Sequence, residues 1–506
     1  MEHLTIKNNE SVKTETIPVY SYYDFYDRAL ELSKNNNCHC VNYFGYNTGN
    51  KLKFICCIAD DTDHTVHLLS YELDQKENIQ LPSLTVDVYA YHIYEREINE
   101  NFGIQFIGHP WMKQVRYSYN RFDRKKLIKD HPFIKVTGDE THEVGIGPIH
   151  AGIIEPGHFR FLCQGEDVLH LEIQLGYQHR GVEDLYLKKK HLLQRTILSE
   201  SIAGDTVVGH TLAFVQNMEA LYNIKVPSRV ELLRSLALEL ERIAVHTGDL
   251  SAFCHDLAFQ LGSEVFGALR TSLVNYFQFW CGNRSAKGLI RTDYNPYPFT
   301  LELKERLTKL LDDFEFKFVE MAEKTFSLPS VLNRFERTGI VTKNQTALIG
   351  AVGMAARMAG VKRDIRSSHP FAYFKQVPYT PVLLSSGDVY ARGMLRNLEV
   401  QFSIGYIRSL LELMDKLPAE NNKTDFELYK KNFSPDTFSL ALIEGWRGEI
   451  CHCVVTDKNG ELLKYKVKDP SLHNWMALAL ALRNNEISDF PINNKSFNLS
   501  YCGNDL

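Results

Sequence analysis

The ten cysteines are the residues of this chain best suited to bind a metal or to carry redox chemistry. Cys38 and Cys40 form one C-x-C pair and Cys451 and Cys453 form another, while the remaining six are two neighbours and four isolated residues: Cys56, Cys57, Cys163, Cys254, Cys281 and Cys502. None of these spacings is the C-x-x-C of most zinc and iron-sulfur sites. Both C-x-C pairs lie in strand-like sequence, where alternate side chains share a face and small apolar side chains pack well. The spacing therefore favours packed, free thiols over a metal site.

Two pairs of a carboxylate and a histidine are suited to moving protons. Asp205 precedes His210 in ESIAGDTVVGH, and Glu155 follows His150 in GPIHAGIIEPGHF. A partly buried carboxylate beside a histidine has a proton affinity that its surroundings set, which is what a proton relay requires. For His150 and Glu155, a solvent-facing pair on a loop is the alternative interpretation.

Other charged residues have a structural interpretation beside a functional one. His179 and Arg180, in YQHRGVEDL, are candidates for buried ion pairs with Glu183 or with a neighbouring helix. A second group has two interpretations, a structural salt-bridge network or the polar wall of a cavity: Asp364, Arg366 and His369.

Two elements must position these residues. Leucine and isoleucine recur at helical spacing in RVELLRSLALELERIAVH, so the sequence predicts a helix over residues 229–246 with one face in the core. Ser228 precedes this run and Glu231 follows at the spacing of a capping box. Two alternating runs flank Asn459-Gly460 and predict a β-hairpin. That hairpin leads directly into Asp469-Pro470.

The order of elements predicts an α+β fold, with a small N-terminal α/β domain followed by a large, mainly α-helical domain that carries small β-hairpins. A helical segment at residues 23–34 precedes strand-like runs at residues 38–46, 52–59 and 64–73. Residues 117–143 are basic, polar and weakly periodic, which is typical of a linker. We therefore expect an N-terminal tail at 1–20, a first domain at 21–116, the linker at 117–143 and a second domain at 144–506.

Bulk properties argue against several classes of protein. A formal charge of -5 and a pI near 6.4 give no reason to expect nucleic-acid binding. The first residues lack the apolar core of a signal peptide, and no run reaches the roughly 18 apolar residues of a membrane span. We therefore expect a cytoplasmic protein that reaches a membrane only through its partners.

Several segments together resemble two known families. YEREINENFGIQFIGHP, at residues 94–110, resembles the E-R-E-x-x-x-x-F-G-I-x-F-x-G-H-P signature of the C subunit of respiratory complex I. From about Gly145 the chain resembles the superfamily that joins the D subunit of complex I to nickel-iron hydrogenase large subunits, at GPIHAGIIEPGHFRF, LGYQHRGVEDL, GVKRDIRSSHPF, GDVYARGMLRNLE and EGWRGE. The E-P-G-H-F form and the fusion of both modules are most similar to the formate hydrogenlyase large subunit of the group 4 hydrogenases. The resemblance covers nearly the whole chain beyond about residue 20.

The resemblance also identifies where this chain departs from its metal-binding relatives. Those relatives hold nickel and iron with four cysteines, in R-x-C-G-x-C-x-x-x-H and in D-P-C-x-x-C. The four aligned positions here are Ala203, Thr206, Ser471 and Asn474. A nickel site of this type needs soft thiolates, which methyl, hydroxyl and amide groups do not replace. We therefore expect that the chain binds no metal at this place and has no hydrogenase activity.

The quinone-reducing relatives imply a further comparison. In complex I a His of the first motif and a Tyr near the Ala203-Gly204-Asp205 stretch are expected to hold the quinone headgroup. This chain has His150 and Glu155 around the first position and no Tyr around the second, while Asp256 aligns with a third position. The standard quinone geometry is therefore incomplete. The cavity residues that the resemblance implies, for a proton relay or an acceptor site, are His150, Glu155, Asp205, His210 and Asp256.

The resemblance implies the large catalytic-arm subunit of a membrane-associated, complex I-like or hydrogenase-like oxidoreductase. It would couple electron transfer, with quinone as one acceptor, to ion translocation without a nickel-iron centre. The chain itself would bind no cofactor, and the nearest iron-sulfur cluster would belong to a partner small subunit similar to the complex I B subunit. Ferredoxin-like and antiporter-like membrane subunits are the other implied partners. One alternative is a non-catalytic structural or coupling subunit, which is favoured if bulky side chains fill the former metal cavity. Another is an active nickel-iron hydrogenase, an interpretation that only stoichiometric nickel in the purified protein would support.

Overall fold

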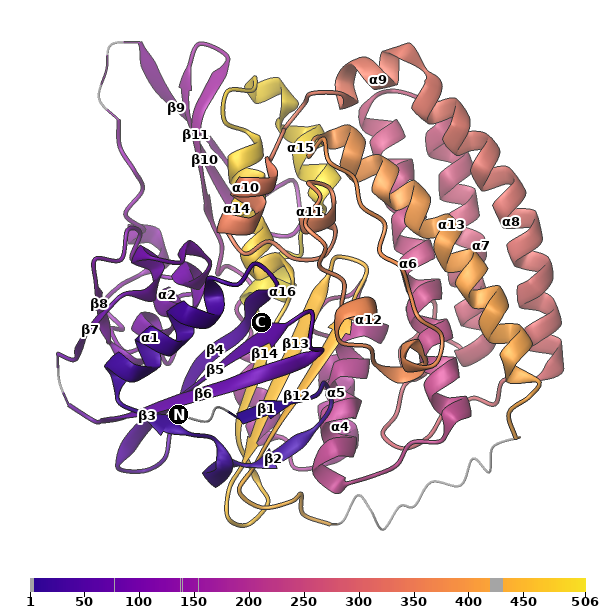
Figure 1. Cartoon of the computed structure of the whole chain (residues 1–506). Helices are drawn as coiled ribbons and strands as arrows, with labels where there is room; N and C mark the ends of the chain where they lie inside the picture. The colour runs from indigo at the N-terminus through magenta and orange to yellow at the C-terminus, as the bar shows by residue number, and fades with distance from the viewer. Residues whose placement is uncertain (1–3, 77, 137, 139, 153, 419–430) are drawn as a thin grey trace.

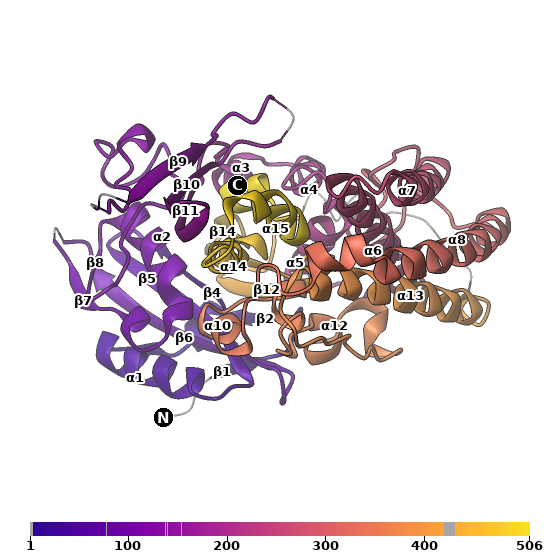
Figure 2. The ribbon, with the colours of Figure 1, turned by 90° about the horizontal axis from the view of Figure 1, so that it is seen from above.

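The computed structural model describes residues 4–76, 78–136, 138, 140–152, 154–418 and 431–506. A sheet-rich N-terminal region lies on one side, a bundle of long helices lies on the other, and a central sheet with the C-terminal helices lies between them (Figures 1 and 2). The predicted α+β class, with a small N-terminal α/β part and a larger helical part, is confirmed.

The first sheet is an antiparallel meander of β4 (Cys38–Asn47), β5 (Lys51–Asp60) and β6 (Thr65–Asp74). Alternate residues of β5 enter two different cores, because successive side chains of a strand point to opposite faces. The even-numbered apolar residues lie under α1 (Tyr22–Ser33), and the odd-numbered ones share a core with the central sheet and the helices. Helix α2 (His92–Phe102) also packs against β4. The middle strand is therefore buried on both faces.

Residues 4–20, part of the predicted tail at 1–20, supply three strands to two sheets. β1 (Leu4–Ile6) and β3 (Val19–Tyr20) pair with β6, and β2 (Ser11–Lys13) pairs with β12. Ile6 and Ile17 are only 2% and 1% exposed. Burial of these two side chains fixes the segment against the rest of the molecule.

The central sheet contains the predicted hairpin. β12 (Thr437–Glu444), β13 (Glu449–Thr456) and β14 (Leu462–Lys468) form an antiparallel meander, and Gly460 adopts a positive φ of 75° in the turn between β13 and β14. The hairpin prediction is thus confirmed. The other strands form a three-stranded and a two-stranded sheet: β9 (Thr141–Ile146), β10 (His158–Gln164) and β11 (Asp167–Gln174), and β7 (Gln80–Pro82) with β8 (Gln105–Ile107).

Five long helices lie in the second part of the chain (Figure 2): α5 (Val207–Tyr222), α6 (Ser228–Asp256), α7 (Gln260–Cys281), α8 (Leu301–Ser327) and α13 (Val389–Met414). The predicted helix after Ser228 is confirmed, but its predicted capping box is wrong. Pro227 takes the extended N-cap conformation and its carbonyl accepts from Val230 and Glu231, so Ser228 is already the first helical residue.

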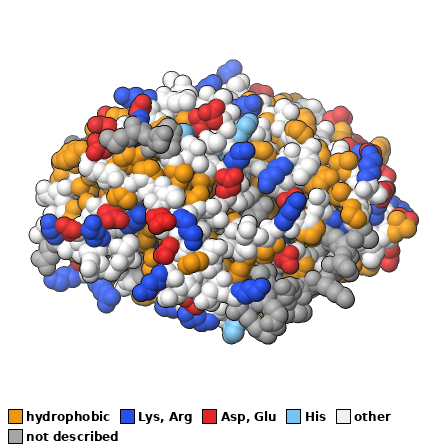
Figure 3. Space-filling model, turned by 60° about the horizontal axis from the view of Figure 1, so that its bottom comes forward, with side chains coloured by type: hydrophobic (Ala, Val, Ile, Leu, Met, Phe, Trp, Pro, Cys, Tyr) orange, Lys and Arg blue, Asp and Glu red, His pale blue; other side chains and the backbone are white. Residues whose placement is uncertain are grey.

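Shorter helices complete the fold: α3 (Val182–Lys188), α4 (Leu192–Ser199), α9 (Pro329–Phe335), α10 (Lys343–Leu348), α11 (Met354–Arg357), α12 (Ile365–Ser368), α14 (Ser471–Ala481), α15 (Phe490–Phe497) and α16 (Tyr501–Asp505). No helix in the described part of the chain combines the length and apolar character that a membrane span needs. Acidic and basic side chains are interspersed on the face in Figure 3.

Candidate functional site

The two segments that the resemblance relates to metal binding meet in the protein interior. His210 lies in the first turn of α5 and Asp469 directly follows β14, and their Nε2 and Oδ2 atoms are 3.0 Å apart. The other ring nitrogen of His210 lies 3.1 Å from Nε2 of His452, and Nδ1 of His452 lies 2.8 Å from the hydroxyl of Tyr465. We call these four linked side chains the central relay: Tyr465, His452, His210 and Asp469.

Local structure explains how Asp469 reaches its place. Its Oδ1 accepts from the backbone N–H of Ser471 at 2.8 Å, which orients Oδ2 toward His210. Gly503 leaves the space that Oδ2 occupies, because a Cβ there would lie 2.5 Å from this atom. Burial is the largest single influence and raises the pKa of Asp469, but the bond and charge of His210, the charge of Arg447 and the bond from Ser471 together outweigh it. The pKa is therefore lowered, and the group is a carboxylate near neutral pH.

Asp205 and Arg447 form the outer part of the site. The carboxylate accepts two bonds from the guanidinium, at 2.7 and 2.6 Å, and the indole N–H of Trp446 donates to the Asp205 carbonyl at 2.9 Å. The Asp205 side chain is 41% exposed whereas that of Arg447 is 4% exposed. Bidentate pairs fix geometry as well as charge. The pair therefore extends from the solvent-exposed surface, at Asp205, into the buried interior, at Arg447.

Glu241 on α6 lies beside this pair. Its carboxylate accepts from the backbone N–H groups of Val208, at 2.7 Å, and Gly209, at 3.2 Å, at the start of α5. Burial raises the pKa of Glu241 to about 8, and the charge of Asp205 adds to the increase. Glu241 is therefore a buried carboxyl group that changes its protonation close to neutral pH.

The four positions aligned with nickel ligands are all buried, with at most 1% of each residue exposed: Ala203, Thr206, Ser471 and Asn474. Their polar atoms contact protein groups. The Thr206 hydroxyl donates to Asp205 at 3.1 Å and accepts from Arg447 at 3.2 Å, while the Ser471 hydroxyl accepts from the Ser500 N–H at 2.9 Å. The Asn474 amide forms two 3.1 Å bonds, one with the N–H and one with the carbonyl of Val352.

His150 and Glu155 are both half-buried on the loop before β10. Nε2 of His150 lies 2.8 Å from the carbonyl of Gly157, so the ring bonds within its own loop. The Glu155 carboxylate accepts from the backbone N–H of Cys502 at 3.4 Å. Glu155 thus contacts the C-terminal segment that also bonds to Ser471, whereas His150 bonds within its own loop.

Asp256 is exposed at the last position of α6. It follows Glu241 by fifteen residues on the same helix. At ~1.5 Å per residue, this separates the two residues by roughly 22 Å along the helix axis. The structure therefore brings Asp205, His210 and Glu155 near the two converging segments and leaves Asp256 apart from them.

A buried ion-pair cluster lies deeper between α6, α11, α12, α13 and β12. Its members have essentially no exposed side-chain surface: Glu239, Arg242, His246, Arg357, Asp364, Arg366, Glu399 and Glu444. Arg357 bonds to Glu399 at 2.6 Å and to Glu444 at 2.7 Å. Burial raises the pKa of Glu444 to about 7, with the charge of Asp364 as the next cause.

The sequence interpretation anticipated only part of this cluster. Asp364 and Arg366 form the predicted salt bridge, at 2.7 Å. His369 lies outside this cluster: its Nδ1 is 3.5 Å from a carboxylate oxygen of Asp61, and its Nε2 contacts the carbonyl of Thr65. The residues that were missed carried one signal, the spacing of Glu239, Arg242 and His246 along one face of α6.

The predicted ion pairs of His179 and Arg180 with Glu183 do not form. The His179 ring contacts the carbonyl of Asp505, and the Arg180 guanidinium donates to the carbonyls of Ser201, Ile202 and Cys502. The Glu183 carboxylate instead pairs with lysines of β14. His179 and Arg180 therefore bond to backbone carbonyls, some of them in the C-terminal segment, and not to carboxylates. The ion-pair prediction failed because the sequence pattern does not show these backbone partners.

Comparison with known proteins matches both parts of this fold. The family model described as the respiratory-chain NADH dehydrogenase 30 Kd subunit matches residues 22–136, and that of the 49 Kd subunit matches residues 265–505. Hydrogenase-4 component G and formate hydrogenlyase subunit 5, both of Escherichia coli K12, are each 27% identical over 82% of this chain, covering 73% and 74% of their own lengths. The fused C/D subunit of NADH-quinone oxidoreductase from Phocaeicola vulgatus is 24% identical over 83% of this chain and 86% of its own length.

Fold and matches together define a class of protein, the large subunits of complex I-like and hydrogenase complexes. Within that class, this chain belongs to the fused form that joins the 30 Kd-type and 49 Kd-type domains in one polypeptide. It is a subunit of an oxidoreductase complex of this family. The match to the 30 Kd subunit extends into the predicted linker at 117–143, and the exact domain boundaries stay predictions.

Proposed function

We propose that this chain is the large peripheral-arm subunit of a membrane-associated oxidoreductase, in which it couples electron transfer to ion movement without a nickel-iron centre. One observation carries the proposal. The two segments that bind metal in hydrogenases converge at His210 and Asp469, but the four ligand positions offer no thiolate. The framework of the site is therefore retained and its donor set is changed.

The residues present do not fit nickel. The aligned donor set is a methyl group, two hydroxyls and an amide, whereas soft thiolates are what such a site requires. The Asn474 amide is also committed to both backbone groups of Val352, and the Thr206 hydroxyl is committed to Asp205 and Arg447. We therefore assign no step of the function to a metal at this place.

Protonation supplies the coupling in this proposal. Asp205 is open to solvent, Glu241 beside it has a pKa of about 8, and the bonded pair of His210 and Asp469 is buried. A change in charge on a neighbouring redox centre shifts the proton affinity of such groups. An electron that arrives nearby would thus be linked to uptake or release of a proton at Glu241.

The partners follow from the relatives. We propose that an iron-sulfur small subunit delivers electrons, that ferredoxin-like and antiporter-like subunits complete the assembly, and that the complex lies on the cytoplasmic side of the membrane. Quinone is the acceptor that we would test first, because relatives of this chain are named NADH-quinone oxidoreductase subunits. Glu155 and His150 are the residues that we propose for the acceptor side of the site.

The test is Asp205→Asn in the assembled complex. Loss of the carboxylate removes the solvent-exposed entry group of the proposed relay and the charge that acts on Glu241, so we expect turnover to fall and its pH dependence to shift while the complex still assembles. Asp312→Asn is the matched control, because Asp312 is 63% exposed and pairs with a surface arginine. Unchanged turnover and an unchanged pH profile in Asp205→Asn would refute the relay.

A non-catalytic structural subunit is the second candidate, and one observation favours it. The four former ligand positions are buried and their polar atoms are bonded within the protein, as expected of a filled site. Under this alternative, Asp205→Asn would change the stability of the assembly without changing the pH profile of its turnover.

A further inference from the structure

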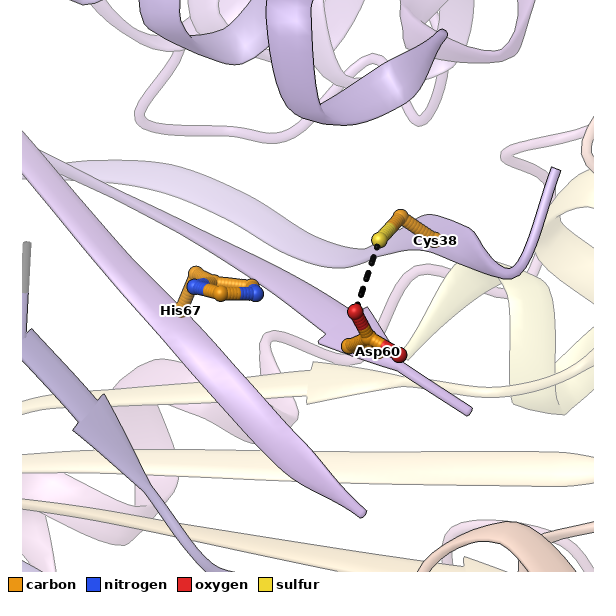
Figure 4. A group of neighbouring side chains, drawn as sticks. All are labelled: Cys38, Asp60 and His67. Carbon is orange, nitrogen blue, oxygen red and sulfur yellow. Dashed lines mark hydrogen bonds between the residues drawn. The ribbon is translucent and has the colours of Figure 1, made fainter. Parts of the chain in front are cut away.

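Three side chains with different donor atoms meet at one end of the first sheet (Figure 4). They are Cys38 on β4, Asp60 on β5 and His67 on β6, and their donor atoms all lie within 4.8 Å of one another. Each residue is buried, with exposures of 5%, 8% and 8%. The cluster lies in the 30 Kd-type part of the chain and has no role in the function proposed above.

The strand register brings these residues together. Cys38 is directly opposite Asp60 in the β4–β5 pair, and His67 is opposite Ile58 in the β5–β6 pair. Because Ile58 and Asp60 are two residues apart, all three side chains lie on one face of the sheet. Cys38 and Ile58 belong to the core under α1, so this is the face that α1 covers.

The distance between sulfur and oxygen suits a metal ion. Sγ of Cys38 is 3.4 Å from Oδ2 of Asp60. In a tetrahedral zinc site with Zn–S of ~2.3 Å and Zn–O of ~2.0 Å, the two donor atoms are about 3.5 Å apart. A metal ion therefore fits between them with little movement of either strand.

The carboxylate is already oriented for such a role. Oδ1 of Asp60 accepts from the backbone N–H groups of Thr62, at 2.8 Å, and Asp63, at 3.1 Å. These bonds leave Oδ2 directed at Cys38 (Figure 4). Outer contacts of this kind hold metal ligands in place in known sites.

The local charge favours a cation. The carboxylates of Asp60, Asp61 and Asp63 place negative charge around the Cys38 thiol. A divalent ion would replace the thiol proton, which passes to solvent, and would offset part of this negative charge.

We propose that Cys38, Asp60 and His67 bind a zinc ion through one sulfur, one oxygen and one imidazole nitrogen, with water at the fourth position. Sulfur, nitrogen and oxygen together form a donor set that zinc accepts readily. The ion would fasten β4, β5 and β6 to one another at this end of the sheet. The spacing of cysteines in the sequence gave no sign of the site, because the partners of Cys38 lie on adjacent strands and Cys40 is not one of them.

The test measures zinc in the purified full-length chain after dialysis against a weak chelator. We expect one zinc per chain in the wild type and binding weakened at least roughly 100-fold in Cys38→Ser and in His67→Gln. Cys163→Ser is the matched control, because it removes a buried thiol on a different sheet and should keep the zinc. Circular dichroism would establish that each variant folds.

Cobalt substitution tests the sulfur ligand directly. Co²⁺ bound at this site should give a near-ultraviolet thiolate-to-cobalt band that is present in Cys163→Ser and lost in Cys38→Ser. If Cys38→Ser does not fold, His67→Gln decides, because it keeps the thiol and removes one ligand. The proposal is overturned by wild-type chain without stoichiometric zinc, by full zinc content in His67→Gln, or by an unchanged cobalt band in folded Cys38→Ser.

Discussion

The 3.0 Å contact between Nε2 of His210 and Oδ2 of Asp469 joins two segments that lie 259 residues apart in the chain. One segment begins α5 and the other follows β14, so the contact ties the helical part of the second domain to the central sheet. Both groups are buried, and the pKa of Asp469 is lowered despite the burial. The contact therefore stabilises the folded chain and also defines the centre of the proposed relay.

Asp469→Asn should weaken this junction. The variant removes the charge that strengthens the bond from His210, and hydrogen bonds to charged groups contribute about 2 kcal/mol. We expect the free energy of unfolding, measured in urea at pH 7, to fall by about that amount. Because the folded pKa of Asp469 is lowered, its contribution is present at neutral pH and is lost as the pH falls below about 4. A stability difference between wild type and variant that does not shrink in acid would contradict this assignment, and Asp312→Asn is the control.

Glu241→Gln should change how stability depends on pH. The folded pKa is raised from 4.5 to about 8, so wild-type stability is full below about pH 4.5 and declines as the pH rises toward 8. Between pH 5 and 8 we expect the wild type to lose roughly 2–5 kcal/mol relative to Glu241→Gln. Thermal unfolding across this range measures the difference, with the exposed Glu264→Gln as the control. Parallel pH profiles for wild type and Glu241→Gln would rule out the raised pKa.

Glu399→Gln should strongly destabilise the ion-pair cluster. The Glu399 carboxylate bonds to Arg357 at 2.6 Å and to His246 at 2.9 Å, with no exposed side-chain surface. Removal of one partner from a buried pair leaves an uncompensated charge and costs about 3–5 kcal/mol. The surface pair of Glu320 and Lys324 has the same 2.6 Å distance, but Glu320→Gln should change stability by at most about 0.5 kcal/mol. Similar losses for the two variants in denaturant titrations would disprove the argument.

Asn474→Ala tests whether this former ligand position is a structural one. The substitution leaves the N–H and the carbonyl of Val352 without their side-chain partner in a buried site. Each unsatisfied group costs about 1–3 kcal/mol, so we expect a loss of at least about 2 kcal/mol. Asn432→Ala, which removes one exposed bond to the Asn459 carbonyl, should have little effect. A stable Asn474→Ala protein would show that the position is not needed to hold the fold.

Local sequence patterns predicted the parts of the fold that are set locally. Alternation around Asn459-Gly460 predicted the hairpin, and leucine periodicity predicted the helix after Ser228. The capping box failed because the extended conformation of Pro227 starts the helix one residue earlier. The N-terminal strands were missed because they are two or three residues long and form only against distant partners.

Less of the candidate site could be predicted, because it is formed by contacts between residues that are far apart in the sequence. The motifs identified Asp205, His210 and Asp469, but not the 2.7 Å bond of Arg357 with Glu444, which lies 87 residues farther along the chain. A charged residue inside an apolar segment is expected to be buried, but the sequence does not identify the residue with which it forms an ion pair. The zinc ligands proposed on β4, β5 and β6 were missed for the same reason, since strand register rather than sequence spacing brings them together.

We propose that electron transfer in this assembly involves no nickel at the site beside His210 and Asp469. The most direct measurement is elemental analysis of the purified complex, combined with an assay of electron transfer to quinone on the same preparation. We expect iron from the clusters of partner subunits, nickel far below one per complex, and quinone reduction that falls in Asp205→Asn. One nickel per complex, with hydrogen production that depends on it, would show that the nickel-iron centre is present and active.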